Sequence, residues 1–140
     1  MQEFSARKGC HGILPGPNSN MRGVPDIAFQ ASARTGTLVY DSGEGGWFIV
    51  GGTSCSAPQW AGLIAIADQI KGHRLGLINP ALYALAANPM TYANDFYDVI
   101  VGNNQTTLSI PGYSASTGWD AVTGLGTPNA ANLVPALAGF

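Results

Sequence analysis

Apolar residues in this chain occur in short runs that are separated by glycine, proline and asparagine. Two of these runs, 37–40 (TLVY) and 47–50 (WFIV), are rich in β-branched and aromatic residues and enclose a glycine-containing loop at 41–46. Runs of this composition around such a loop predict a β-hairpin. The apolar stretch 24–31 (VPDIAFQA) predicts a buried strand ahead of the hairpin.

Two helices are predicted in the second half of the chain. The first covers 79–87, where Asn79 is a typical N-cap and Pro80 a typical first residue. The second is a short helix over 128–137. Between them, the stretch 88–127 is heavy in Gly, Asn, Ser and Thr, so it predicts loops and short strands.

A serine between the hairpin and a further helix is the main candidate for chemistry. The string 51–58 (GGTSCSAP) sets Ser54 in a glycine-rich turn, and a helix is predicted over 58–70 with Pro58 in its first turn. Unpaired amides and the positive end of the helix dipole favour developing negative charge there, which suits a nucleophile. The alternative is that a hydroxyl of this string caps the helix, as serine commonly does.

Composition predicts a globular chain and excludes two classes of partner. Of the 140 residues, 46% are hydrophobic, which is enough for a core. The formal net charge is −2 and no basic stripe is present, so we expect no nucleic-acid partner. The longest apolar run, 63–67, is far too short to cross a membrane, and residues 1–8 lack the apolar core of a signal peptide.

The two cysteines, Cys10 and Cys55, allow one disulfide at most, and we expect two free thiols. Cys55 is expected to face the core at the start of the helix. As a rival nucleophile it would need a positioned histidine, and neither His11 nor His73 has a catalytic signature around it.

The serine string belongs to a longer pattern. The sequence GTSCSAP at 52–58, followed by AGLIA at 61–65, resembles the nucleophile segment of the sedolisins, the serine-carboxyl peptidases related to subtilisins. RGVPDI at 22–27 and GLINPALY at 76–83 are similar to further segments of that family. The resemblance covers most of residues 22–137. In the turn at 31–36, serine and alanine replace the family's usual acid and proline, without touching a catalytic group.

This resemblance implies an α/β fold. Residues 21–140 would form the C-terminal part of a sedolisin catalytic domain, after an irregular N-terminal segment at 1–20. The family's subtilisin-like core is a mostly parallel sheet with flanking helices, and this piece would supply only some of its strands. We therefore expect an incomplete sheet that leaves an edge and an apolar face uncovered.

The resemblance also implies one calcium site. The strings 97–104 (YDVIVGNN) and 116–129 (STGWDAVTGLGTPN) are similar to the two arms of the family's site. The ligands would be the carboxylates of Asp98 and Asp120 and the main-chain carbonyls of Val99, Ser116 and Gly118. Calcium takes six or more oxygens, and water would complete this set. Without the resemblance, the two acids would be taken for turn or cap residues.

By the same resemblance, Ser54 forms an acyl-enzyme in a serine-type endopeptidase that cleaves peptide or protein substrates in acid. A glutamate acts as base, an aspartate orients it, and another aspartate helps to form the oxyanion hole. Neither acid motif occurs here, since the only glutamates are Glu3 and Glu44. We expect a fragment that is inactive alone and that needs a missing N-terminal catalytic segment. Extracellular localisation is implied by the family.

Two alternatives come from other classes. The chain could be a non-catalytic calcium-binding structural or interaction module derived from this fold, with Ser54 a helix cap. It could also be a relative of the histidine-based subtilisins, but their serine is usually followed by methionine and alanine, whereas Cys55 and Ser56 follow Ser54 here.

Overall fold

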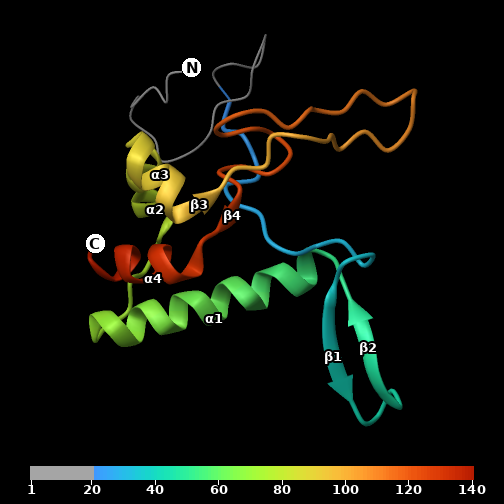
Figure 1. Ribbon diagram of the computed structural model, residues 1–140, viewed down its shortest axis with the longest axis horizontal. Helices are drawn as coiled ribbons and strands as arrows, with labels where there is room; N and C mark the ends of the chain where they lie inside the picture. The colour runs from blue at the N-terminus through green and yellow to red at the C-terminus, as the bar shows by residue number, and fades with distance from the viewer. Residues whose placement is uncertain (1–20) are drawn as a thin grey trace.

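Residues 21–140 are described by a computed structural model, so the segment predicted at 1–20, with Cys10 and His11, lies outside the described residues. The elements mix helix and strand, consistent with a part of an α/β protein (Figure 1). In chain order they are β1 (Thr37–Asp41), β2 (Gly46–Val50), α1 (Thr53–Lys71), α2 (Asn79–Ala86), α3 (Pro89–Asp95), β3 (Phe96–Tyr97), β4 (Thr127–Pro128) and α4 (Ala130–Ala138).

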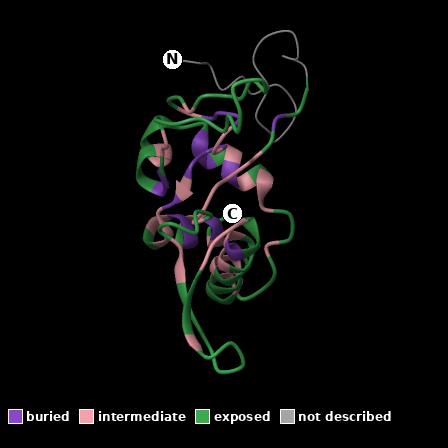
Figure 2. Cartoon of the chain, turned by 90° about the vertical axis from the view of Figure 1, so that its right-hand side faces the viewer, coloured by how far each residue is buried: buried purple, intermediate pink, exposed green. Residues whose placement is uncertain are grey.

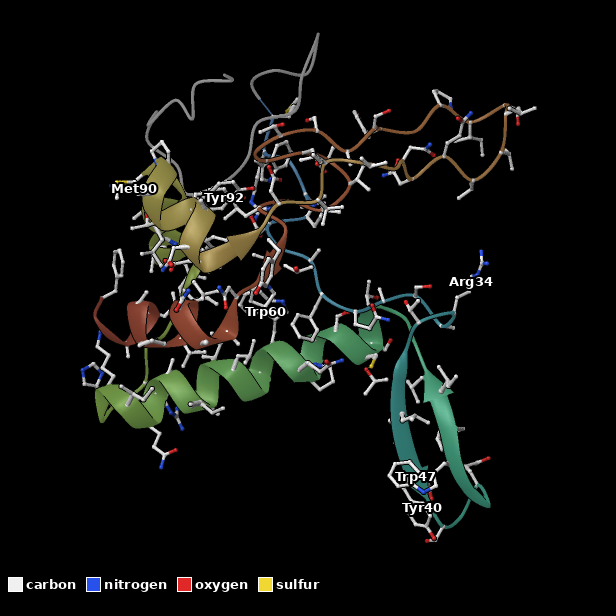
Figure 3. The ribbon with its side chains drawn as sticks, in the orientation of Figure 1. Arg34, Tyr40, Trp47, Trp60, Met90 and Tyr92 are labelled. Carbon is white, nitrogen blue, oxygen red and sulfur yellow. The ribbon has the colours of Figure 1, made fainter. Side chains whose placement is uncertain are left out.

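The predicted hairpin is confirmed. Strands β1 and β2 pair antiparallel, and Tyr40 faces Trp47 across the ladder. Their rings form an edge-on contact with centroids 5.4 Å apart at the outer end of the hairpin (Figure 3). With Leu38 and Ile49 they make one apolar face that is well exposed, Trp47 by 70%. Figure 2 shows the hairpin extending as an exposed arm from the body. The expectation of an uncovered apolar face is thus confirmed for this hairpin.

The predicted strand at 24–31 and the mostly parallel sheet are not formed within the described residues. The two sheets there, β1–β2 and β3–β4, are both antiparallel pairs. Residues 24–31 form no regular element and bend at residues 24 and 26, and they are joined to Leu125 and Gly126 by two backbone hydrogen bonds of 2.9 Å. Gly124 and Gly126 have φ values of 63° and 90°, which turn the neighbouring segment away from a regular ladder.

The sequence predicted that this helix begins at Pro58, but α1 begins at Thr53. Gly52 has a φ of 98°, and its carbonyl accepts the amides of Cys55 and Ser56 at 2.9 and 3.3 Å, which closes the first turn. Proline removes only one donor, the one that would reach the Ser54 carbonyl, so the helix tolerates Pro58 in its second turn. Ser54 therefore lies inside the first turn.

The second half of the chain holds one helix that was not predicted. Helix α3 lies in the stretch expected to be loop and strand, and Asn88 caps it by accepting the Met90 amide at 2.9 Å. Helices α2 and α4 are confirmed near their predicted positions. Asn79 is not the cap of α2, because the N-cap is Ile78 and the Asn79 amide donates to Asp26.

The core lies where α1 packs against α4, with α2 and α3 on the other side of α4 (Figures 1 and 2). Trp60 anchors α1, and its indole donates to the Ala28 carbonyl at 3.2 Å. Its ring meets Phe29 at 6.5 Å between centroids. The least exposed large side chains are all leucines: Leu82, Leu125, Leu133 and Leu137.

Asp26 joins three parts of this fold. Its carboxylate accepts from the Arg22 guanidinium at 2.6 Å, from Asn79 at 3.0 Å and from the Tyr83 hydroxyl at 2.9 Å. We expect Asp26→Ala to lower the free energy of unfolding by about 3 kcal/mol, because these donors lose a largely buried charged acceptor. Urea unfolding measures the change. Asp41→Ala, at the exposed hairpin end, is the matched control, and an equal effect of the two would contradict this role.

Candidate active site and calcium site

Two glycines shape the turn that carries Ser54. A Cβ on Gly51 would lie 2.4 Å from the Ala33 nitrogen, so only glycine allows this close backbone approach. Gly52 adopts a φ of 98°, which side-chain-bearing residues rarely take, and its amide donates to the Ala31 carbonyl. The turn is therefore held against residues 31–33, and Ser54 follows it directly.

Ser54 is exposed, and its hydroxyl makes no hydrogen bond among residues 21–140. The N-cap of α1 is Gly52, without a side-chain cap bond, so Ser54 does not act as the cap. Ser56 is the serine that is engaged, because its hydroxyl donates to the Gln30 carbonyl at 2.9 Å. The arrangement leaves the Ser54 oxygen available at a helix N-terminus, as a nucleophile requires.

No base accompanies Ser54 in the described part of the chain. Glu44 lies in the turn at the outer end of the hairpin (Figure 1). His73 lies beyond the last residue of α1, roughly 27 Å along the helix. Cys55 is a buried free thiol that accepts from Gln59 at 3.1 Å, so its predicted structural role is confirmed. Neither Glu44 nor His73 is therefore positioned to act as a base for Ser54.

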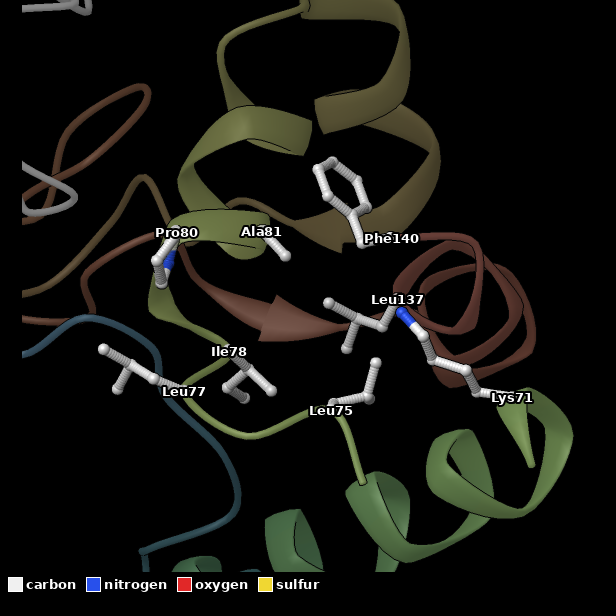
Figure 4. Close-up of a pocket in the computed structure, with 8 residues that line it drawn as sticks. All are labelled: Lys71, Leu75, Leu77, Ile78, Pro80, Ala81, Leu137 and Phe140. Carbon is white, nitrogen blue, oxygen red and sulfur yellow. The ribbon is translucent and has the colours of Figure 1, made fainter. Parts of the chain in front are cut away.

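The cavity in Figure 4 is also remote from Ser54. It holds about 200 Å³ and lies between the end of α1, the start of α2 and the end of α4. Its lining is apolar except for one lysine, and consists of Lys71, Leu75, Leu77, Ile78, Pro80, Ala81, Leu137 and Phe140. This cavity therefore has no part in the chemistry considered for the serine.

The two predicted calcium arms meet in the structure. The Gly118 amide on the second arm donates to Asp98 Oδ2 on the first at 2.8 Å. Asp120 is 5% exposed, and its Oδ2 accepts from the Ser116 amide at 2.9 Å. Val99 follows Asp98 directly and is half-buried. Hydrogen bonds thus join the two arms at Asp98 and Gly118, and connect Asp120 with Ser116 inside the second arm.

One oxygen of this group has no partner. Asp98 Oδ1 is buried and accepts no hydrogen bond from residues 21–140, although an isolated buried carboxylate oxygen is costly. Among the described residues the one ion pair joins Arg22 to Asp26, so neither Asp98 nor Asp120 has a cationic side chain. The same residues contain no group of three or more His, Cys, Asp or Glu side chains suited to a metal. A calcium site built from two carboxylates and main-chain carbonyls fits both observations.

Comparison with known proteins identifies the family. No family model matches the chain. Over 88% of its length it is 41% identical to kumamolisin of Bacillus sp. strain MN-32. It is 36% identical over 84% of its length to tripeptidyl-peptidase 1 of Dictyostelium discoideum, and 41% identical over 77% to a tripeptidyl-peptidase of Arthroderma otae. The chain is a homologue of the sedolisins.

This sedolisin homologue spans only part of its relatives' length, namely 21%, 19% and 15% of those three proteins. None of its described helices combines the length and the apolar character needed to cross a membrane.

In this sedolisin homologue, the segment 25–31 connects the second of the two predicted arms with the serine turn. At one end, Trp119 donates to the Pro25 carbonyl at 3.0 Å, and the Leu125 amide donates to Asp26 at 2.9 Å. At the other end, the carbonyls of residues 30 and 31 accept from Ser56 and Gly52. Residue patterns alone do not identify these partners, because each bond joins positions that are distant in the chain.

Proposed function

We propose that this chain is the nucleophile-bearing and calcium-binding part of a sedolisin peptidase with a subtilisin-like arrangement. Its reaction is peptide-bond hydrolysis in acid through an acyl-enzyme on Ser54. The observation that carries the proposal is the exposed, unbonded Ser54 hydroxyl in the first turn of α1, directly after the Gly51 and Gly52 turn. Homology to kumamolisin and to tripeptidyl-peptidases supports the class of reaction.

The chemistry begins at the helix N-terminus. Ser54 Oγ attacks the carbonyl carbon of the scissile peptide bond, and its proton passes to the base. The base returns this proton to the leaving amine as the C–N bond breaks, and water then hydrolyses the ester on Ser54. The amides of Thr53 and Ser54 make no hydrogen bond among the described residues, so they are available to a developing oxyanion. The glutamate base, its aspartate and the oxyanion aspartate are proposed to come from a separate N-terminal catalytic segment.

Exposed apolar surface supports association with such a segment. Besides the hairpin face, Ile66 and Ile70 on α1 are 50% and 58% exposed. Exposed apolar patches such as the hairpin face often mark protein–protein contacts. We propose a peptide or protein as substrate and an extracellular location, both from the sedolisin homology.

One calcium ion belongs to this proposal. The carboxylates of Asp98 and Asp120 and the carbonyls of Val99, Ser116 and Gly118 would hold it. When bound, the ion supplies positive charge that joins the two arms and compensates their acids. The unpartnered Asp98 Oδ1 is the observation that supports a cation here.

The serine assignment is tested by complementation. This chain is mixed with the N-terminal catalytic region of kumamolisin, and hydrolysis of a peptide substrate is measured in acid. We expect activity only in the mixture. Ser54→Ala should lower the rate by about a thousandfold or more, because the acyl-enzyme cannot form.

Ser42→Ala, in the exposed hairpin turn, is the control and should leave the rate unchanged. Efficient hydrolysis by this chain alone, or a Ser54→Ala mixture as active as wild type, would overturn the assignment.

A non-catalytic calcium-stabilised module is the second candidate. The lack of any base near Ser54 in the described residues is the observation that favours it. Calcium-dependent stability without activity in any complemented mixture would support this candidate over the peptidase.

A further inference from the structure

Tyr92 lies between the two arms that carry the proposed calcium ligands. It projects from α3 toward these segments in Figure 3. Its ring is half-buried and packs against Phe96 with centroids 5.6 Å apart. Its hydroxyl donates to the Leu125 carbonyl at 3.1 Å. The side chain is therefore held at both its ring and its hydroxyl.

The Tyr92 side chain connects two segments that carry proposed ligands. Helix α3 continues through β3 directly into Asp98, so the Tyr92 backbone leads into the first arm. Leu125 follows the turn in which Asp120 and Gly124 exchange two backbone hydrogen bonds of 3.1 and 2.9 Å. The hydrogen bond of the Tyr92 hydroxyl thus connects the helix before Asp98 with the residue that follows the Asp120 turn.

The electrostatic surroundings agree with this placement. Burial raises the pKa of Tyr92, and the charge of Asp98, a hydrogen-bond interaction with Asp98 and the charge of Asp120 raise it further. Asp98 and Asp120 are therefore both close enough to act on the Tyr92 side chain.

We propose that Tyr92 is a positioning residue for the calcium site, whose hydroxyl sets the distance between the Asp98 and Asp120 arms. The inference rests on the proposed calcium binding and adds to it a residue that is not itself a ligand. Partners of this kind, outside the ligands, typically change metal affinity by about 10- to 100-fold when they are removed. Tyr92→Phe removes the hydroxyl and keeps the ring that contacts Phe96.

The test measures metal affinity in the whole chain. Tb³⁺ replaces Ca²⁺, and its luminescence is excited through tryptophan, since Trp119 lies between two proposed ligand residues, Gly118 and Asp120. Competition with Ca²⁺ gives the calcium affinity. We expect Tyr92→Phe to lower the affinity for each of the two ions about tenfold or more. Tyr97→Phe is the matched control, because this exposed tyrosine precedes Asp98, and it should bind as wild type does.

Each outcome separates the two proposals. If wild type binds neither ion, the calcium site itself is wrong. If wild type binds and Tyr92→Phe binds equally well, the calcium site stands and the role of Tyr92 is overturned. A lower melting temperature in EDTA with unchanged affinity would likewise reduce Tyr92 to a structural residue. Should the variant fold only with calcium, the calcium concentration that restores its near-ultraviolet circular dichroism gives the affinity, and a midpoint equal to that of Tyr97→Phe overturns the proposal.

Discussion

Asp98→Asn is expected to abolish stabilisation by calcium while leaving the calcium-free protein at least as stable as wild type. The amide oxygen of asparagine can still accept from the Gly118 amide, as Asp98 Oδ2 does. The buried Oδ1, which has no hydrogen-bond partner, loses its charge. A metal at a hundred times its dissociation constant stabilises the folded state by about 2.7 kcal/mol. Calcium should raise the free energy of unfolding of wild type by an amount of this size, and that of the variant by less than about 0.5 kcal/mol.

Thermal unfolding in EDTA and in excess calcium measures both effects. Asp41→Asn is the matched control, since it removes a carboxylate from the exposed hairpin end and should keep the full calcium increment. An Asp98→Asn variant that gains as much from calcium as wild type would exclude Asp98 as a ligand. A large loss of stability in EDTA would mean that the carboxylate serves the metal-free fold instead.

Leu133→Ala is expected to lower the free energy of unfolding by about 2–5 kcal/mol. This side chain is 1% exposed, in the part of α4 that packs against α1. Removing it leaves a cavity that a close-packed core fills only in part. Both the lost transfer free energy of the side chain and this cavity lower the free energy of unfolding. Because ordinary domains have a stability of only about 5–15 kcal/mol, this loss is a large share of the total.

Leu108→Ala makes the same chemical change where it should cost almost nothing. Leu108 is 99% exposed, so we expect a change within about 0.5 kcal/mol. Urea unfolding of both variants gives the comparison. Equal destabilisation by the two substitutions would show that α4 is not packed on α1 in solution.

The elements that were predicted correctly are those whose signal is local. The hairpin follows from two β-rich runs around a glycine loop, and α2 follows from an apolar run with proline near its start. Pro58 was misleading because a proline in the second turn costs a single hydrogen bond, which a well-closed first turn offsets. Helix α3 carries the same Asn-Pro signal as α2, at Asn88, but the polar composition around it favoured a loop.

In the candidate site, too, the features with a local signal were predicted and those that depend on distant contacts were not. Ser54 was placed at a helix start by its glycine turn, and the structure has it in the first turn of α1. A calcium site that includes Asp98 and Asp120 was implied by the sedolisin resemblance and stays a prediction. In the structure Asp98 accepts from the amide of Gly118, two residues before Asp120. Tyr92 was not singled out, and Ser56 was considered only as a helix cap. Their actual partners, Leu125 and the carbonyl of residue 30, lie 33 and 26 positions away in the chain.

By itself, the sequence determined the local parts of this protein: a glycine turn that presents a serine at a helix N-terminus, an apolar hairpin and two glycine-rich arms with one acid each. These features depend on backbone freedom, side-chain shape and neighbouring residues, all of which are set within a few positions. Only the tertiary structure decided that the arms meet, that Asp98 Oδ1 is buried without a partner among residues 21–140, and that the segment 25–31 forms no sheet ladder. Those outcomes depend on which distant groups are brought close and removed from water, and no local pattern encodes that.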